Sequence, residues 1–102
     1  MTKHPSEDIR VRLAQDLNRA FESSDPQIIS EAIGRAIREY NIAEIARKTG
    51  LNRPSIYRAF GGQRFPNFTT VLSVLNAMGF SVKVVTSRSA SWRVNLPPHP
   101  DK

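Results

Sequence analysis

Apolar residues recur at helical spacing through residues 1–79 and then switch to strict alternation. The helical part contains five apolar stretches, each opened by a residue suited to a helix N-cap, namely Ser6, Asp25, Asn41, Asn52 and Asn67. Pro26 follows Asp25 and has no N–H to lose in a first helical turn. Glycines close the third, fourth and fifth stretches at positions 50, 61–62 and 79. The pattern therefore predicts five short helices.

The apolar face of each stretch gives the expected core. In the first, second and fifth stretches it comprises Ile9, Leu13, Leu17, Ala20 and Phe21, then Ile28, Ile29, Ala32, Ile33, Ala36 and Ile37, then Phe68, Val71, Leu72, Leu75 and Met78. Glu7 and Asp8 lie in the first turn of the first helix, where the helix dipole favours acids. Asn41 and Glu44 have the spacing of a capping box.

After Gly79 the apolar period becomes two. Alternation at Phe80, Val82 and Val84 predicts one strand, and alternation at Trp92, Val94 and Leu96 predicts a second. The link 87–90 contains no Gly or Asn, the residues that favour a tight hairpin turn. The sequence therefore supports each strand more strongly than it supports a hairpin that joins them. An isolated hairpin is marginal in water, so these strands should pair with a second copy, another protein or the helical body.

These patterns predict a mainly α protein with three parts. Residues 1–79 form a five-helix domain, residues 80–96 form a C-terminal strand or hairpin for dimer or partner contact, and residues 97–102 form a mobile tail. Pro97, Pro98 and Pro100, which lie in that tail, end any strand ladder.

Residues 42–61 have the spacing of a helix-turn-helix. Ala46 is small enough for two helices to cross closely, and Gly50, four residues later, suits the sharp turn between them. Ile56 and Ala59 fall on the inner face of the second helix. Asn52, Arg53, Pro54, Tyr57 and Arg58 fall on its outer face. A basic, hydrogen-bonding outer face is how such a unit places a helix in the DNA major groove.

The distribution of charge supports an acidic partner. The formal net charge is +6. Residues 1–40 contain six Lys/Arg and seven Asp/Glu, whereas residues 41–102 contain nine Lys/Arg and two Asp/Glu. No acidic residue occurs between Glu44 and Asp101. Because solvated surfaces usually mix both signs, this stretch indicates contact with a polyanion, although chance in a small protein is the alternative.

Candidate DNA-binding residues follow from the unit at 42–61 and its flanks. Arg53, at the helix start, is expected to reach base edges, and Arg58 to reach phosphate. For Asn52, capping this helix is a simpler role than contacting DNA. For Tyr57, a structural role as a partly buried aromatic residue is as well supported as a DNA contact. The full set is Asn52, Arg53, Pro54, Ser55, Tyr57, Arg58, Arg47, Lys48, Gln63, Arg64 and Asn67. Candidates for a dimer or partner interface are Phe80, Val82, Val84 and Trp92.

Several functional classes lack support in the sequence. Cysteine is absent, so no disulfide framework or thiolate chemistry is expected. His4 and His99 have no paired ligand spacing, so we expect neither a metal nor a cofactor. No nucleophile–base pair or phosphate-binding glycine loop is present, which argues against an enzyme. Without a signal peptide or a long apolar run, a cytoplasmic protein with no membrane contact is expected.

The chain resembles the antidote (antitoxin) subunits of the addiction-module antidote family. The similarity covers roughly residues 10–86 and rests on residues 24–26, 32–33, 45–51, 55–59, 67–72, 75 and 77–80. Residues 87–102 extend beyond the family pattern, and the loop 61–66 is more basic and aromatic than a bare turn requires. The helical part also resembles the lambda-repressor-like (Xre-type) DNA-binding domain. The resemblance implies a homodimeric repressor of its own operator that also silences a small basic toxin, commonly an RNase that cuts mRNA on the ribosome.

Two further possibilities compete with this interpretation. One is a stand-alone phage-type repressor without a toxin, and the other is a pure protein-interaction module whose basic half meets an acidic protein. Within the antitoxin interpretation, two surfaces are candidates for the toxin. One is the N-terminal half, with Glu7, Asp8, Asp16 and Glu22, and the other is the C-terminal hairpin with Trp92.

Overall fold

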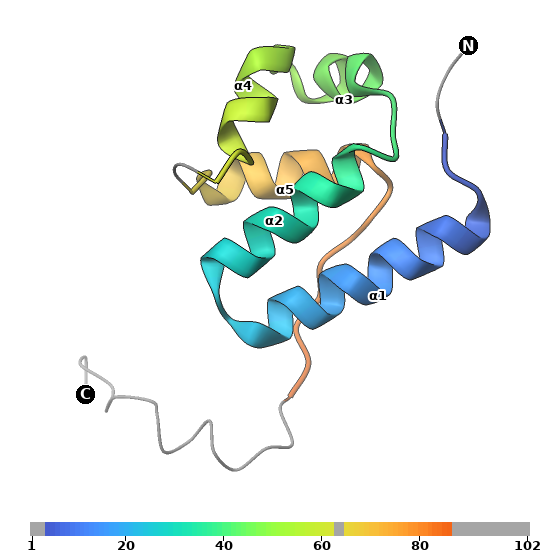
Figure 1. The fold of residues 1–102 in the computed structure, drawn as a ribbon, viewed down its shortest axis with the longest axis vertical. Helices are drawn as coiled ribbons and strands as arrows, with labels where there is room; N and C mark the ends of the chain where they lie inside the picture. Colours follow the sequence, from blue (N-terminus) through green and yellow to red (C-terminus); the bar gives the residue numbers. More distant parts are fainter. Residues whose placement is uncertain (1–3, 63–64, 87–102) are drawn as a thin grey trace.

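The computed structural model describes residues 4–62 and 65–86, and these residues form five helices (Figure 1). Their bounds are α1 Glu7–Ser23, α2 Pro26–Ile37, α3 Ile42–Thr49, α4 Arg53–Ala59 and α5 Phe68–Ala77. The predicted mainly helical class and all five predicted helices are therefore confirmed.

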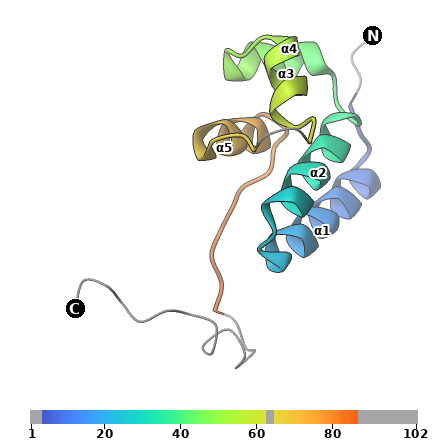
Figure 2. The same cartoon turned by 60° about the vertical axis from the view of Figure 1, so that its left-hand side comes forward.

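The helices form two groups joined by α5. Both views place α1 beside α2, while α3 and α4 lie together at the other end of the molecule (Figures 1 and 2). Helix α5 contacts α3, and its Val74 belongs to the same buried cluster as Ile33 of α2. The chain then runs from the end of α5 back along the α1 side through Thr86.

All five predicted N-caps are formed. Each is a side-chain oxygen that accepts a hydrogen bond from a first-turn backbone N–H, which otherwise has no partner within its helix. The bonds join Ser6 Oγ to Ile9 N (3.3 Å), Asp25 Oδ1 to Gln27 N (2.9 Å), Asn41 Oδ1 to Ala43 N (2.9 Å), Asn52 Oδ1 to Ser55 N (2.8 Å) and Asn67 Oδ1 to Thr70 N (2.8 Å). Short polar side chains therefore fix where every helix begins.

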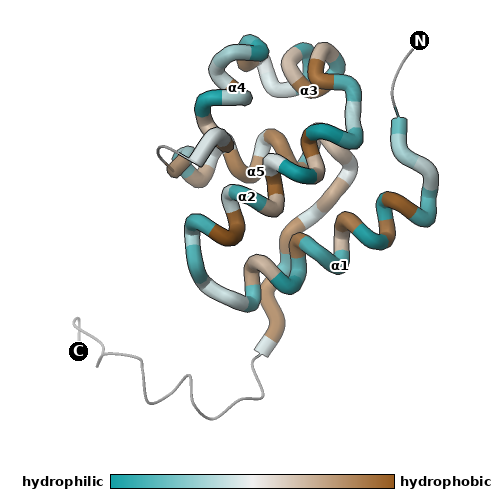
Figure 3. Tube along the Cα trace, viewed as in Figure 1, coloured by the Kyte–Doolittle hydropathy of each residue, from teal (hydrophilic) through white to brown (hydrophobic). Residues whose placement is uncertain are grey.

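The core lies where the two helical groups meet. Its largest fully buried side chains are Ile33 from α2, Ile45 from α3, Ile56 from α4 and Val74 from α5, so four helices contribute to one cluster. Leu17 and Ala20 bring α1 to the same cluster. Figure 3 shows hydrophobic and hydrophilic positions alternating along α1 and α2, as expected for helices with one buried face.

Two predicted core positions are wrong. Ile28 is 43% exposed and Phe68 is 69% exposed, although both share a periodic pattern with buried neighbours. Each lies in the first turn of its helix, where Ile29 and Val71, rather than Ile28 and Phe68, pack against the core. Val74, absent from the predicted set, is completely buried. Since α5 is apolar around most of its circumference, periodicity alone did not select its inner face.

Glycine closes two helices by adopting the left-handed conformation. Gly50 has φ +78° and donates its N–H to Ala46 O at 2.9 Å, which ends α3. Gly79 has φ +90°, and bonds from Gly79 N to Asn76 O (3.0 Å) and from Phe80 N to Leu75 O (2.9 Å) complete a Schellman motif after α5. The predicted stops at these two glycines are confirmed.

Replacing Gly50 by alanine is expected to lower the free energy of unfolding by about 1–2 kcal/mol, the cost of a left-handed L-residue. A Cβ at this position would meet no atom within 4 Å, so the loss is conformational rather than steric. Urea denaturation measures it. Gly50→Asn is the matched control, because Asn tolerates this region better and should lose less. Equal stability of Gly50→Ala and the parent would contradict the explanation.

The predicted strand over 80–86 is not formed in the single chain. Phe80 turns inward and makes an edge-on ring contact with Tyr40, with centroids 6.3 Å apart. Residues 81–86 continue without helix or strand and are exposed. A strand needs a hydrogen-bonded neighbour, and the residues that the structure describes offer this segment none. The second predicted strand, with Trp92, lies outside the described residues, as does the predicted tail at 97–102.

Candidate nucleic-acid interface

Helices α3 and α4 are held as a pair by short local contacts. Thr49 Oγ1 donates to Ile45 O at 2.8 Å and accepts from Leu51 N at 3.2 Å, which shapes the turn after α3. Asn52 then caps α4. Ile45 and Ile56 bury the inner faces of the two helices, 1% and 0% exposed. The turn and the two isoleucines therefore fix which side of α4 faces solvent.

The solvent side of α4 is basic and aromatic. Arg53, Pro54, Tyr57 and Arg58 are all exposed, and 56% of the Tyr57 surface is accessible. Ser55 is partly buried, with its N–H used by the Asn52 cap. Within the part of the chain that the structure describes, neither Arg53 nor Arg58 is paired with a carboxylate. Both guanidinium groups are therefore available to an anionic partner.

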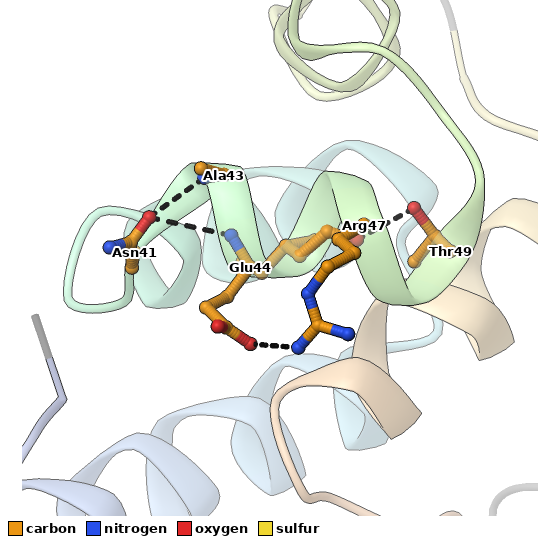
Figure 4. A network of polar contacts seen from close by, with 6 residues as sticks. Asn41, Ala43, Glu44, Arg47 and Thr49 are labelled. Carbon is orange, nitrogen blue, oxygen red and sulfur yellow. Dashed lines mark hydrogen bonds and ion pairs between the residues drawn. The ribbon is translucent and has the colours of Figure 1, made fainter. Parts of the chain in front are cut away.

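The predicted DNA-binding residues outside α4 differ in whether their side chains are free to contact DNA. Arg47 Nη2 binds Glu44 Oε1 at 2.7 Å on the surface of α3, and Figure 4 shows this pair together with the Asn41 cap. Glu44, predicted to complete a capping box with Asn41, thus directs its carboxylate to Arg47. Lys48 and Asn67 are exposed, and Asn67 caps α5. Gln63 and Arg64 lie outside the described residues.

An ion pair between Arg35 and Asp16 links α2 to α1. The hydrophobic periodicity of the sequence did not predict it. Arg35 Nη2 lies 3.0 Å from Asp16 Oδ2, and further bonds of 3.2 and 3.3 Å make the contact bidentate. Glu7 Oε1 lies 3.3 Å from Arg10 Nη1. Of the four acids suggested as a toxin-binding face, Asp16 and Glu7 are therefore already paired within the chain, whereas Asp8 and Glu22 are exposed. The Arg35–Asp16 contact joins residues 19 positions apart, which no local pattern indicates.

A mainly apolar groove of about 560 Å³ separates α1 from the segment after α5. Leu17, Phe21, Phe80, Val82 and Val85 are among the residues that line it. Of the predicted interface residues, Phe80 and Val82 thus lie on this groove, and Val84, 96% exposed, points away from the protein. Trp92 lies outside the described residues.

A second, more polar cavity of about 270 Å³ lies between α1, α3 and the end of α5. Arg10 and Tyr40 line it, and neither was singled out by sequence. Interaction with the Tyr40 phenol, and to a lesser degree with Glu7, raises the pKa of Arg10 above its ordinary value. Arg10 is therefore a permanent cation at this cavity.

Residues 4–62 and 65–86 contain neither a metal-binding cluster nor a helix that could span a membrane. These residues contain no group of three or more His, Cys, Asp or Glu placed to hold a metal ion. None of the helices they form has the length and apolar character needed to cross a membrane.

The molecule is thus a small helical protein with a basic, exposed short helix held against a compact core. Residues 6–86 match the family described as "Probable addiction module antidote protein", and the chain belongs to this family. Membership supports an antitoxin role with a toxin as partner. An uncharacterized protein of Haemophilus influenzae is 34% identical over 74 residues, which cover 72% of this chain and 76% of that protein. No solved structure matches the chain.

Proposed function

We propose that this chain is the antitoxin of a type II toxin–antitoxin module. It neutralises a small, basic, ribosome-dependent RNase toxin by direct binding, and it represses its own operon by binding operator DNA as a homodimer in the cytoplasm. The observation that carries the DNA-binding part is the solvent side of α4, where Arg53, Tyr57 and Arg58 are exposed and both arginines lack a carboxylate partner among the described residues. Family membership carries the antitoxin part.

In this proposal α3 and α4 act as an Xre-type helix-turn-helix within a lambda-repressor-like arrangement of five helices. Helix α4 enters the major groove with Arg53, in its first turn, nearest the bases. Arg58, in the last turn, reaches a backbone phosphate. Lys48 and Arg47 flank the groove and add contacts that do not depend on base sequence.

Dimerisation would use the segment after α5. Residues 81–86 are exposed and have no strand partner in the described chain, although Val82, Val84 and Val85 are apolar and β-branched. Pairing with the same segment of a second copy would satisfy the backbone and cover these side chains. Two copies would then present α4 to half-sites about 34 Å apart on a near-palindromic operator.

Val84→Asp is expected to convert the dimer to a monomer, because it places a charge where a neighbouring strand would pack. Sedimentation velocity would show the change in mass, and the helical circular dichroism should persist because Val84 is 96% exposed. Val11→Asp on α1 is the matched control, since Val11 is also exposed, at 48%, but lies outside this segment. A Val84→Asp protein that remains dimeric would refute dimerisation through residues 80–86.

Two parts of the chain are candidates for toxin binding. The exposed acids Asp8 and Glu22 of α1 would attract a basic protein, and Glu22 also lines the apolar groove beside Phe21 and Val82. The alternative is the C-terminal segment containing Trp92, which lies outside the described residues.

The antitoxin role is tested by co-expression with the product of the adjacent toxin-sized reading frame. Joint purification at a fixed stoichiometry, with relief of growth arrest, is the expected result. The affinity of the protein for operator DNA is then measured in the presence and in the absence of that partner. A chain that binds DNA specifically but neither retains nor neutralises the neighbouring product would be a stand-alone phage-type repressor.

A further inference from the structure

The apolar groove between α1 and the segment after α5 has two walls of opposite charge. Its α1 wall includes Leu17 and the carboxylate of Glu22, and its other wall includes Val82, Lys83 and Val85. Leu17 is only 5% exposed, whereas Val82 and Val85 are 47% and 71% exposed. The groove, of about 560 Å³, therefore has a packed apolar floor and an upper part that is open to solvent.

The groups around this groove are not matched within one chain. Val84 is 96% exposed, more than any other large hydrophobic residue that the structure describes. It lies between Val82 and Val85, which line the groove, but it does not line the groove of its own chain. Glu22 and Lys83 are exposed, and neither forms an ion pair within residues 4–62 and 65–86. The chain thus has an open apolar groove, a projecting apolar side chain and an unpaired charge of each sign.

These features complement one another across a two-fold axis. In a symmetric dimer, a contact from residue i of one copy to residue j of the other is always accompanied by the contact from j to i. An acidic wall and a basic wall on one groove can therefore meet their opposites twice, with Glu22 of each copy facing Lys83 of the other. The projecting Val84 follows Lys83 directly, so the same axis brings each Val84 to the groove of the other copy.

We propose that this groove is the docking site for Val84 of a second copy, with Lys83 of each chain paired to Glu22 of the other. The inference rests on the dimerisation through residues 80–86 proposed above, and it adds that α1 forms half of the contact. Glu22 and Lys83 are the charged residues of the lining, so the charge of the groove is balanced. A basic toxin would meet Lys83 as well as Glu22, which favours a second copy as the occupant.

Disulfide cross-linking tests the docking of Val84, because the chain contains no cysteine of its own. Asn18→Cys, at an exposed groove position on α1, and Val84→Cys are prepared as separate full-length proteins with different tags. The two are mixed, allowed to exchange subunits and mildly oxidised. Since each chain then carries one thiol, a disulfide that joins the two tags links different copies, and it requires Cβ atoms about 4 Å apart. We expect this 18–84 disulfide to form in the mixed dimer.

The matched control pairs Val11→Cys with Val84→Cys. Val11 is also exposed on α1, at 48%, but it does not line the groove, so little disulfide should join these two proteins.

Charge reversal tests the proposed ion pair independently. Glu22→Lys and Lys83→Glu each place like charges opposite one another at both copies of the contact, and each should raise the dimer Kd about tenfold. The double variant restores opposite charges and should return the Kd to near that of the parent. Sedimentation equilibrium measures these constants. Asp8→Lys is the control, since Asp8 is exposed on α1 outside the groove and its reversal should leave the Kd unchanged.

The outcomes separate this inference from the dimerisation on which it rests. A monomeric parent protein would refute the dimer itself. A dimeric parent with no more 18–84 disulfide than the Val11 control, or a double variant whose Kd does not recover, would overturn docking in the groove and leave dimerisation intact. Two other results would assign the groove to another occupant. One is a disulfide within a single chain that carries Asn18→Cys and Trp92→Cys, and the other is protection of the thiol of Asn18→Cys from alkylation only when the toxin is added.

Discussion

Replacing Arg53 and Arg58 together by alanine is expected to abolish specific operator binding and leave the fold intact. Both side chains are exposed on α4 and neither is paired with a carboxylate in the described chain, so their removal leaves no buried group unsatisfied. A good bidentate contact to a base contributes about 1–3 kcal/mol, and a phosphate contact adds to it, so a loss of at least about 100-fold in affinity is expected. Fluorescence anisotropy with the operator measures the loss, and circular dichroism checks the fold.

The matched control is Arg12→Ala with Arg19→Ala. It removes the same two positive charges from exposed positions on α1, away from α4. If α4 is the recognition helix, this control should retain near-parental affinity at moderate salt, and only Arg53→Ala/Arg58→Ala should lose discrimination between operator and random DNA. An equal loss in both double variants would mean that net charge alone drives binding. Unchanged operator affinity after Arg53→Ala/Arg58→Ala would exclude α4 as the DNA-contacting element.

Ile56→Ala is expected to destabilise the protein by about 2–5 kcal/mol, the range for truncating a buried isoleucine. Ile56 is completely buried, and it is the residue by which α4 reaches the shared core with Ile33, Ile45 and Val74. Because small domains have only about 5–15 kcal/mol of net stability, much of the fold's margin would be lost. Urea denaturation followed by circular dichroism measures the change.

Ile28→Ala makes the same chemical change at a site that is 43% exposed. It should alter stability by no more than about 0.5 kcal/mol, as is usual for surface positions. Operator affinity should fall for Ile56→Ala as unfolded chains accumulate, and stabilising solutes should restore it. If the two isoleucine variants were equally stable, Ile56 could not be the anchor that fixes the orientation of α4.

The local chemistry of single residues determined the helices. Asp25, before Pro26, caps α2, and Asn52 caps α4. These capping bonds join residues only two or three positions apart, so the sequence alone could predict them. Gly50 and Gly79 end helices for an equally local reason, since only glycine takes a positive φ without strain. The inward position of Ile56 also followed from helical spacing, which sets the faces of α4 once its start is known.

Tertiary structure decided the features that depend on contacts between residues far apart in the chain, which residue spacing does not predict. Packing between helices selected Val74 for the core and left Phe68 in solvent, because burial depends on which face another helix covers. The Asp16–Arg35 pair and the cavity formed by Arg10 and Tyr40 join residues far apart in the chain, so no local pattern contains them. Alternation after Gly79 predicted a strand, yet 80–86 has none within the single chain, because a strand is defined by its neighbour and not by its own residues. The sequence thus determined the helices and their polar and apolar faces, and long-range packing decided which faces meet and which remain open to a partner.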